Sequence, residues 1–331
     1  MKAVILAGGE GRRLRPVSGE TPKPMVELVG VPVMERTVRL LRAQGFSELC
    51  SALYYRPKVI EDYFGDGSQF GVSMQYRVQN EPRGTAGSVL QCADFYGEDD
   101  FLVVSGDAVF DFDLAALMER HRQSHAVVTM ALHPSAEPLQ YGLVLLDRDS
   151  RVRHFVEKPD WGHVVTNLVN TGIYCISPAA MAYVRPDEPQ DFAKDLFPLL
   201  LASGEKILGV PAEGYWCDIG TPRSYYQCSI DVLDGKLATE PAEPSPSGED
   251  AQGLKNARVI PCRDRARLMR AASESFMELG ADFTDGLHFR DGSWQIGLRP
   301  SAREASLLLD ANSREAADAA EKLIQLMENR L

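Results

Sequence analysis

The first residues that point to chemistry form a glycine- and arginine-rich loop directly after a short apolar run. The loop reads Gly8-Gly9-Glu10-Gly11-Arg12-Arg13-Leu14-Arg15-Pro16. Glycines lack a Cβ, so backbone N–H groups can approach phosphate oxygens, and the three arginines supply positive charge. The loop predicts a triphosphate-binding site. The alternative is an ordinary tight turn, which the arginines and Lys23 make less favourable.

Two well-known phosphate-binding loops do not fit this sequence. A Walker loop needs Gly-Lys-Ser/Thr, and the dinucleotide-binding fingerprint needs a third glycine where Leu14 stands. The loop therefore argues against a P-loop kinase and against a dehydrogenase.

Two aspartates that lie far apart in the sequence are candidates for binding one cation. Asp107 follows the apolar run 101–104, and Asp218 precedes Ile219-Gly220-Thr221-Pro222. Carboxylate oxygens are the ligands that a hard cation prefers, and residues from distant segments commonly converge on one ion. Taken singly, each aspartate has an ordinary explanation, as a helix cap for Asp107 and as a turn residue for Asp218.

The composition excludes several classes of function. The chain has 331 residues, a net charge of −12 and a pI near 5.1. General binding to nucleic acid or to a membrane surface is not expected, since both need a clustered positive field.

The 6 cysteines lack the close pairs of zinc sites and are expected to be buried thiols of a reducing compartment. No apolar stretch has the length of a signal or transmembrane segment, so a cytoplasmic location is expected, and a homo-oligomer is compatible with the sequence.

The elements that must position these residues alternate between strands and helices. The apolar run 2–6 predicts a central strand that is buried on both faces. Helices are expected at 33–43, at 57–64, from 85 and from 114, and strands at 48–55, 72–78, 101–104 and 126–132. Short strands at 142–146, 152–156 and 172–176 lack long intervening helices, so antiparallel pairing is expected. The fold class is α/β, with a Rossmann-like, mixed and mainly parallel sheet.

Composition also divides the chain into two domains. Residues 236–256 are rich in Ala, Glu, Pro, Ser and Gly and predict a linker, because they bury too little apolar surface to order themselves. Residues 1–235 form the main domain and residues 257–331 a small α+β domain. The small domain is expected to contain a helix at 266–279, two strand-like runs around Arg299-Pro300 and a closing helix at 313–327.

Further motifs follow the glycine loop along the main domain. They are Pro22-Lys23-Pro24, Gly84-Thr85-Ala86-Gly87, Gly106-Asp107, Tyr141-Gly142, Glu157-Lys158-Pro159, Asn170-Thr171-Gly172 and Trp216-Cys217-Asp218-Ile219-Gly220-Thr221-Pro222. In this order they resemble the sugar-1-phosphate nucleotidyltransferases, whose fold is GT-A-like. The resemblance implies that a nucleoside triphosphate and a sugar-1-phosphate react to give a nucleotide sugar and pyrophosphate, without a protein nucleophile.

The resemblance implies roles for the charged residues. Asp107 and Asp218 would hold Mg²⁺, which bridges phosphate oxygens while the sugar phosphate attacks the α-phosphorus in line. Arg13 and Lys23 match the family's basic pair, which stabilises the transition state and the departing pyrophosphate.

The resemblance also implies two groups of binding residues. The nucleotide is expected to contact Leu6, Ala7, Gly8, Gly9, Gly11, Arg12, Arg13, Gln79, Gly84 and Thr85. Gly84 and its neighbours would line the base pocket, with Gln79 or Glu81 near it. The sugar phosphate is expected to contact Gly142, Glu157, Lys158, Asn170 and Thr171, with Lys158 on its phosphate group. Arg83 stands where the family usually has an apolar residue.

Motifs of the small domain resemble the C-terminal domain of phosphohexomutases such as phosphomannomutase: Asp285-Gly286, Asp291-Gly292-Ser293-Trp294, Arg299-Pro300-Ser301 and the closing helix. Ala302 and Arg303 replace the glycine and threonine of that family's phosphate loop, so a structural or regulatory role is expected rather than mutase activity. The pairing of the two domains favours GTP and mannose-1-phosphate as substrates and GDP-mannose as the product. The alternatives are glucose-1-phosphate or manno-heptose-1-phosphate as the sugar, and a non-catalytic sensor of nucleotide sugars.

Overall fold

The computed structural model describes residues 1–157, 160, 164–238, 258–261, 264–278, 288–291, 294–300, 306–311 and 313–330. The chain divides into two compact units. The first unit comprises Met1–Gly9, Thr37–Gly106 and Asp111–Trp216, and the second comprises Glu10–Arg36, Asp107–Phe110 and Cys217–Leu331. Each unit is therefore assembled from segments that are far apart in the sequence.

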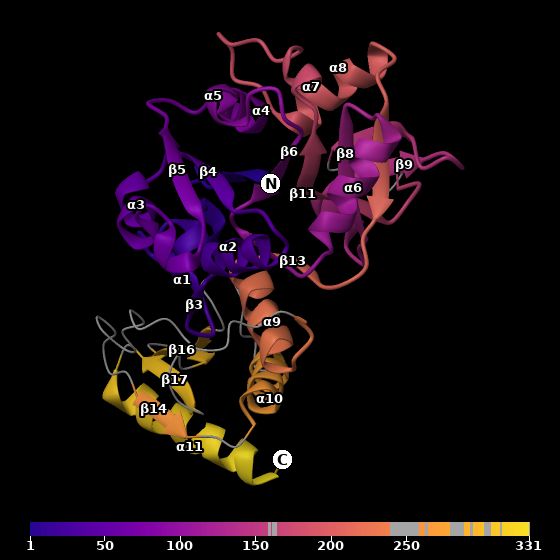
Figure 1. Ribbon diagram of the computed structural model, residues 1–331. Helices are drawn as coiled ribbons and strands as arrows, with labels where there is room; N and C mark the ends of the chain where they lie inside the picture. Colours follow the sequence, from indigo (N-terminus) through magenta and orange to yellow (C-terminus); the bar gives the residue numbers. More distant parts are fainter. Residues whose placement is uncertain are drawn as a thin grey trace. The chain divides into compact units, whose positions relative to one another are not determined.

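A nine-stranded sheet forms the centre of the first unit (Figure 1). The strands on its main path are, in order, β10 (Val152–Glu157), β9 (Gly142–Leu146), β11 (Leu168–Ile176), β6 (Phe101–Ser105), β1 (Lys2–Leu6), β4 (Glu48–Leu53) and β5 (Ser73–Val78). β8 (Val128–Pro134) pairs with β11 and with β12 (Ile207–Pro211). β1 is parallel to β4 and β6, whereas β9, β10 and β11 form antiparallel pairs. The expected mixed α/β sheet with a parallel centre is confirmed.

Local sequence explains why these elements form. Ala3, Val4 and Ile5 of β1 are fully buried, as a strand covered on both faces requires. Asp113 caps the N-terminus of α6 (Leu114–Ser124), because its carboxylate accepts a hydrogen bond from the Ala116 backbone N–H at 2.8 Å. The other helices wholly within this unit are α3 (Pro57–Phe64), α4 (Gly84–Leu90), α5 (Ala93–Tyr96), α7 (Pro178–Met181) and α8 (Phe197–Ala202), and α2 (Val33–Ala43) enters it at Thr37.

β11 differs from its predicted range because a bulge interrupts it. The strand begins at Leu168 rather than at residue 172, and its register shifts between Asn170 and Tyr174. Gly172 lies inside the shift with φ +79°, a backbone conformation that glycine adopts without steric cost. The bulge disrupts the alternation of apolar residues, so the sequence pattern shows only the second half of the strand.

The second unit contains the charged N-terminal segment and the C-terminal elements. Its regular elements are the 3₁₀ turns Arg12–Leu14 and Lys23–Met25, α1 (Arg15–Ser18), β2 (Glu27–Leu28), β3 (Val31–Pro32), β7 (Ala108–Phe110), β13 (Trp216–Asp218), α9 (Pro222–Leu233), β14 (Arg258–Pro261), α10 (Arg265–Glu278), β15 (His288–Asp291), β16 (Trp294–Pro300), β17 (Ser306–Ala311) and α11 (Arg314–Arg330). β13 carries Cys217 and Asp218 into this unit. β14, β17, β16 and β15 form an antiparallel sheet in that order.

One buried apolar cluster joins α9 to the C-terminal elements of the second unit. Tyr226 and Ile230 of α9 lie in it with Leu268, Met269, Ala272, Leu298, Leu309, Ala311, Ala316, Ala317, Ala320 and Ile324. The domain boundaries expected at 235 and 257 stay predictions. Residues 239–256 of the expected linker lie outside the described residues, as do Asp285-Gly286, Gly292-Ser293 and Ser301 to Arg303.

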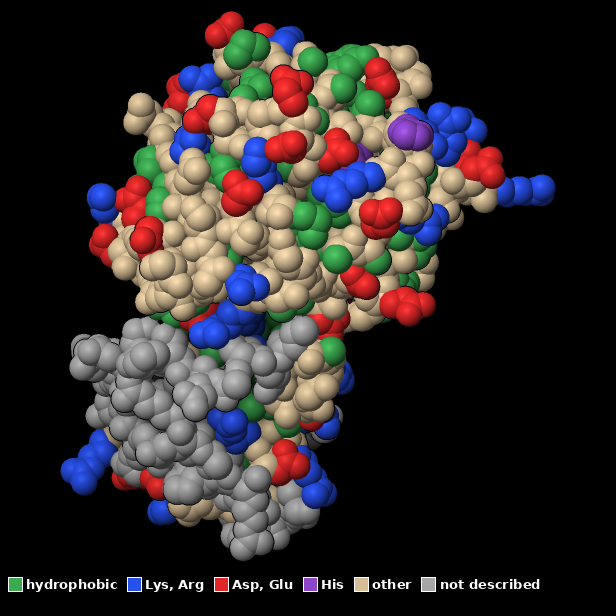
Figure 2. Space-filling model, in the orientation of Figure 1, with side chains coloured by type: hydrophobic (Ala, Val, Ile, Leu, Met, Phe, Trp, Pro, Cys, Tyr) green, Lys and Arg blue, Asp and Glu red, His purple; other side chains and the backbone are tan. Residues whose placement is uncertain are grey.

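The distribution of surface charge and the character of the helices both bear on function. Lys, Arg, Asp and Glu side chains are interspersed on the face shown in Figure 2. Positive charge for an anionic ligand must therefore come from a few local residues. Within the described residues, no helix has both the length and the apolar character needed to cross a membrane.

Candidate active site

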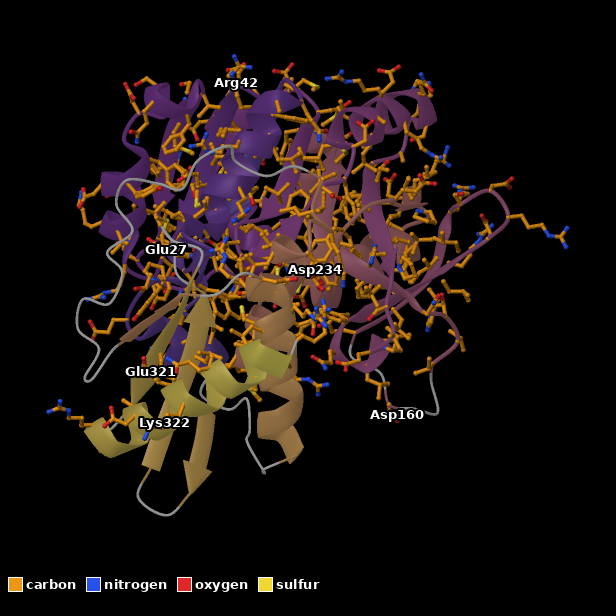
Figure 3. All side chains as sticks on the ribbon, turned by 90° about the horizontal axis from the view of Figure 1, so that it is seen from below. Glu27, Arg42, Asp160, Asp234, Glu321 and Lys322 are labelled. Carbon is orange, nitrogen blue, oxygen red and sulfur yellow. The ribbon has the colours of Figure 1, made fainter. Side chains whose placement is uncertain are left out.

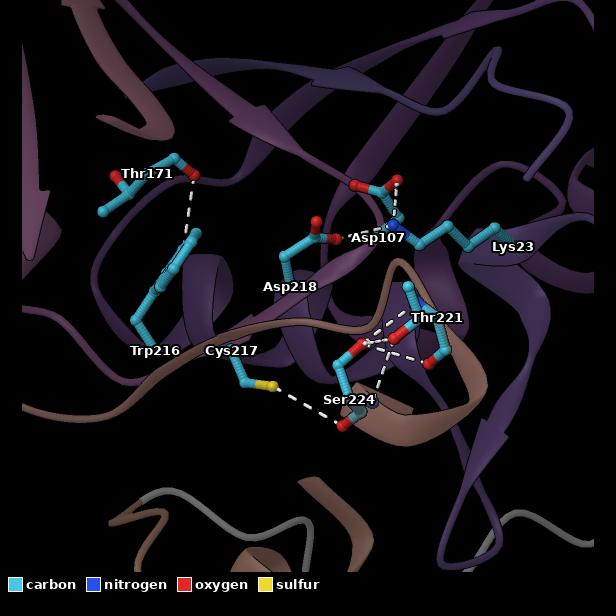
Figure 4. Close-up of polar contacts among 8 residues, drawn as sticks. All are labelled: Lys23, Asp107, Thr171, Trp216, Cys217, Asp218, Thr221 and Ser224. Atoms are coloured by element: carbon cyan, nitrogen blue, oxygen red, sulfur yellow. Dashed lines mark hydrogen bonds and ion pairs between the residues drawn. The ribbon is translucent and has the colours of Figure 1, made fainter. Parts of the chain in front are cut away.

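Three charged side chains meet within the second unit (Figure 4). The ammonium nitrogen Nζ of Lys23 lies 2.8 Å from Oδ2 of Asp107 and 2.7 Å from Oδ1 of Asp218. Asp107 directly precedes β7 and Asp218 ends β13, and these two short strands pair with each other. Two aspartates from distant parts of the chain thus share one positive charge.

Burial makes this ion pair electrostatically strong. The side chain of Lys23 is 9% exposed and each aspartate side chain is 29% exposed. Burial by itself would lower the pKa of Lys23, but the adjacent carboxylates of Asp107 and Asp218 outweigh it and raise the pKa above its ordinary value. Lys23 therefore stays charged and offsets both carboxylates at neutral pH.

Two glycines lie where the backbone approaches this cluster. Gly11 has φ +59°, and a Cβ added there would lie 2.8 Å from Cβ of Lys23. A Cβ on Gly220 would lie 2.9 Å from Oδ2 of Asp218 and 3.2 Å from Nη2 of Arg13. Arg13 and Asp218 therefore flank Gly220, and the glycine loop packs directly on Lys23.

The other arginines of the loop interact with Glu10 on the surface. Arg12 Nε lies 2.7 Å and Arg15 Nη2 lies 3.4 Å from Oε2 of Glu10. The hydrogen bond from Arg12 is the main reason why the pKa of Glu10 lies below its ordinary value. Arg12 would have to exchange this carboxylate for a phosphate in order to bind a nucleotide.

The remaining loop residues lie at the carboxyl end of β1 in the first unit. The Gly106 N–H donates to the Leu6 carbonyl at 2.9 Å, and the Ala7 N–H donates to the Ala52 carbonyl at 3.0 Å. A Cβ on Gly8 would lie 3.3 Å from Tyr54, which makes this position tight. Around Gly9, by contrast, no described heavy atom lies within 4 Å of an added Cβ. Packing alone therefore does not require glycine at position 9.

Gln79, Gly84 and Thr85, which are predicted to contact the nucleotide, lie close together in the first unit. Ser88 links two of them, because its hydroxyl contacts Gln79 Oε1 at 3.2 Å and the Gly84 carbonyl at 2.6 Å. Gln79 is buried, and its Nε2 has no hydrogen-bond partner among the described residues. The Ser88 hydroxyl contacts only one end of the Gln79 amide, so the other end has no partner among the described residues, whichever way the amide is turned.

A segment that no sequence motif indicates braces the first turn of α4. The carboxylate Oδ1 of Asp191 accepts from the Thr85 N–H at 3.0 Å and from the Thr85 hydroxyl at 3.1 Å. The Gln190 carbonyl accepts from the N–H groups of Ala86 and Gly87 at 2.9 and 3.1 Å. These bonds satisfy N–H groups of the first turn of α4, which have no partner within the helix. No local pattern around Gln190 and Asp191 reveals a partner so far away in the sequence.

The predicted sugar-phosphate residues lie on adjacent strands of the first unit. Gly142 of β9 is opposite Glu157 of β10, and a Cβ on Gly142 would lie 2.8 Å from Glu157 Oε2. Asn170 donates from Nδ2 to the hydroxyl of Tyr174 at 2.8 Å. The Thr171 hydroxyl donates to the Ala131 carbonyl at 2.8 Å, so it stabilises the sheet. Lys158, expected on the phosphate, lies outside the described residues.

The donor set of Asp107 and Asp218 fits Mg²⁺. The two carboxylates already converge on one cation, the ammonium of Lys23. Mg²⁺ is commonly bound through one or two carboxylates, with substrate phosphates and water completing its shell. Among the described residues there is no cluster of three or more His, Cys, Asp or Glu side chains that could hold a metal ion. The site therefore suits an ion that arrives with a phosphate ligand.

Solved structures share the fold of this chain. HddC from Yersinia pseudotuberculosis matches with a TM-score of 0.61 and 28% identity, over 70% of this chain and 99% of HddC. A structure of HddC complexed with GMP-PN matches with a TM-score of 0.60 and 27% identity, also over 70% of this chain and 99% of that chain.

Sequence comparison then gives the family. The profile of the nucleotidyl transferase family matches residues 2–235, and the chain belongs to this family. A UTP–glucose-1-phosphate uridylyltransferase of Synechocystis is 34% identical over 250 residues, which are 72% of this chain and 64% of that protein. A mannose-1-phosphate guanylyltransferase of Mycobacterium tuberculosis is 34% identical over 248 residues, which are 75% of this chain and 68% of that protein. The chain thus spans about two thirds of the length of these relatives.

Proposed function

We propose that the chain is a sugar-1-phosphate nucleotidyltransferase that makes a nucleotide sugar and releases pyrophosphate. The observation that carries the proposal is the convergence of Lys23, Asp107 and Asp218 within the second unit. Membership of the nucleotidyl transferase family supports the reaction class. Nucleotidyl transfer needs positioned positive charge on phosphates and no protein nucleophile, which agrees with the types of these residues.

Each charged residue has a role that follows from its chemistry. Asp107 and Asp218 are the residues that would hold Mg²⁺, which supplies a Lewis acid that withdraws charge from phosphate oxygens. Lys23 would neutralise charge that develops as pyrophosphate leaves, since its ammonium is buried and held in place. Arg13, beside Gly220 and Asp218, would bind the same anionic groups through its planar guanidinium.

We propose GTP and mannose-1-phosphate as the substrates and GDP-mannose as the product. The mannose-1-phosphate guanylyltransferase of Mycobacterium tuberculosis supports this choice, and so does the phosphomannomutase-like sequence of the C-terminal residues. Gln79 is proposed to contact the base, because its buried amide has an end without a partner in the described chain. The uridylyltransferase relative makes UTP with glucose-1-phosphate the second candidate pair.

A cytoplasmic location is part of the proposal. Cys50, Cys92, Cys175 and Cys228 are buried thiols in the structure, which agrees with a reducing compartment.

The test is a grid of pyrophosphate-release assays with Mg²⁺, five nucleoside triphosphates and the 1-phosphates of mannose, glucose and manno-heptose. GTP with mannose-1-phosphate is expected to give the highest kcat/KM. A clear preference for UTP or dTTP would replace this substrate pair. No release with any pair, together with binding of a nucleotide sugar by calorimetry, would favour the non-catalytic sensor.

A further inference from the structure

The helix α9 starts directly after the segment that carries Asp218. Thr221 caps this helix: its hydroxyl accepts from the Ser224 N–H at 3.1 Å, and its own N–H donates to the Ser224 hydroxyl at 3.0 Å. The Cys217 thiol lies 3.8 Å from the Ser224 carbonyl, so β13 folds back on the first turn of α9 (Figure 4). Ile219, between Asp218 and the cap, is fully buried. Asp218 therefore has a short and well-fixed connection to α9.

Tyr225 of α9 connects this segment to the one that carries Lys23. Its hydroxyl donates to the backbone carbonyl of Glu27 at 2.8 Å, and Glu27 is labelled in Figure 3. The side chain is 6% exposed, so water competes little for the bond. The backbone between Lys23 and Glu27 is itself fixed, because the Val26 N–H donates to the Lys23 carbonyl at 3.2 Å and Val26 is buried.

We propose that Tyr225 is a positioning residue for the Lys23–Asp107–Asp218 site. Its hydrogen bond closes a ring of contacts that runs from Lys23 through Glu27 and α9 to Asp218, and back through the ion pair to Lys23. Without the bond, Asp218 and Lys23 would keep their charges but lose part of their fixed separation. Reactions that depend on electrostatic stabilisation are sensitive to such small displacements. The proposal rests on the proposed function, because it concerns how that site is held.

The neighbouring Tyr226 offers a matched control on the same helix. Its hydroxyl contacts a backbone carbonyl too, that of Met269 in α10 at 3.4 Å, and it is also buried. Successive residues of a helix point about 100° apart, so the two tyrosines contact different parts of the second unit. Tyr226 belongs to the apolar cluster with the C-terminal elements.

The experiment compares Tyr225→Phe with Tyr226→Phe in the full chain. Binding of Mn²⁺ is measured by EPR in the presence of inorganic pyrophosphate, and kcat and KM are measured by pyrophosphate release. Tyr225→Phe is expected to raise the Mn²⁺ dissociation constant about three- to tenfold and to lower kcat by a similar factor, the effect of one lost hydrogen bond. KM for the sugar phosphate should stay unchanged. Tyr226→Phe should lower the melting temperature without changing Mn²⁺ binding or kcat.

Two results would overturn the proposal. One is an unchanged Mn²⁺ dissociation constant in Tyr225→Phe, and the other is an equal change in both variants, which would indicate general loosening of α9. Failure of the proposed function is a separate result, since the wild-type chain would then release no pyrophosphate with any substrate pair. A difference in Mn²⁺ binding between the two variants would still support positioning by Tyr225 in that case.

Discussion

The charged site of the second unit and the Gly84–Thr85 segment of the first unit are held in different ways. Lys23, Asp107 and Asp218 hold one another through opposite charges, and each comes from a different part of the chain. Gly84 and Thr85 are neutral; the Asp191 carboxylate accepts from Thr85, and the Gln190 carbonyl accepts from the adjacent N–H groups of Ala86 and Gly87. The first arrangement places charge where a reaction can use it, whereas the second fixes the shape of a backbone.

This difference separates the expected effects of substitution. Changes in the charged site should alter the rate of the reaction and the response to a cation. Changes around Gly84 should alter stability, and a change at Gln79 should alter the choice of nucleotide.

The largest effect is expected for Asp107→Asn and Asp218→Asn. Each change removes a charged ligand from the proposed Mg²⁺ site, and loss of one well-aimed electrostatic group typically costs about 10²-fold or more in kcat. Pyrophosphate release at saturating substrate measures it, with circular dichroism to verify the fold. Asp94→Asn is the control, because Asp94 is an exposed partner of Arg77 and should leave kcat unchanged. Near-normal turnover in either site variant would reject the two-aspartate site.

The next effect concerns stability and tests whether charge holds the site together. Lys23→Gln leaves two partly buried carboxylates without their shared counter-charge, so we expect the free energy of unfolding to fall by about 2–3 kcal/mol. Mg²⁺ should restore part of this loss, because an ion between the carboxylates would replace the missing charge. Urea unfolding with and without Mg²⁺ provides the measurement.

Lys2→Gln provides the control for this stability experiment. Lys2 forms an ion pair with the exposed Asp99 at 2.7 Å, and such surface pairs contribute little. If Lys23→Gln were as stable as Lys2→Gln, or if Mg²⁺ affected both equally, the site would not be held by mutual charge.

A smaller effect is expected when Gly84, or Gly9 of the glycine loop, is replaced by alanine. A Cβ on Gly84 would lie 2.4 Å from the Gln190 carbonyl oxygen at φ +69°. Gly84→Ala should therefore destabilise the protein by about 2 kcal/mol. A Cβ on Gly9 would have no described atom within 4 Å, so the melting temperature of Gly9→Ala should equal that of the wild type. The affinity of this variant for a nucleoside triphosphate should nevertheless fall. Equal melting temperatures for the two variants, measured by calorimetry, would contradict this distinction.

The sequence predicts the charged site better than the braced segment for a physical reason. Lys23, Asp107 and Asp218 are charged residues in motifs whose order along the chain resembles one family, and the apolar run 101–104 shows where the strand before Asp107 must end. The contacts of Gln190, Asp191 and Tyr225 depend on ordinary residue types and on folding of distant segments. Sequence patterns therefore indicate that a site exists but do not show which residues hold it in place.

Two threonines show a second limit of sequence reasoning. Thr85 and Thr171 stand in motifs whose resemblance predicts ligand binding, yet their hydroxyls bond to Asp191 and to the Ala131 carbonyl. A hydroxyl has the same appearance in a sequence whether it binds a ligand or stabilises a sheet. Only the tertiary partners distinguish these uses.

The last and smallest effect is expected for Gln79→Met, which keeps side-chain length and removes the amide. Gln79 is buried, and one end of its amide has no partner in the described chain, so the amide is available to the edge of a base. Loss of one such hydrogen bond should lower kcat/KM for the preferred nucleoside triphosphate about tenfold and bring the five nucleotides closer together. Ser88→Ala is the comparison variant, because Ser88 contacts Gln79 Oε1 at 3.2 Å and should affect nucleotide choice in the same direction but less. Both are measured in the same pyrophosphate-release assays. If Gln79→Met lowered kcat/KM equally with every nucleotide, the amide would not select the base. Gln79 would then support the shape of the backbone around it, as the contacts of the neighbouring Gly84–Thr85 segment do.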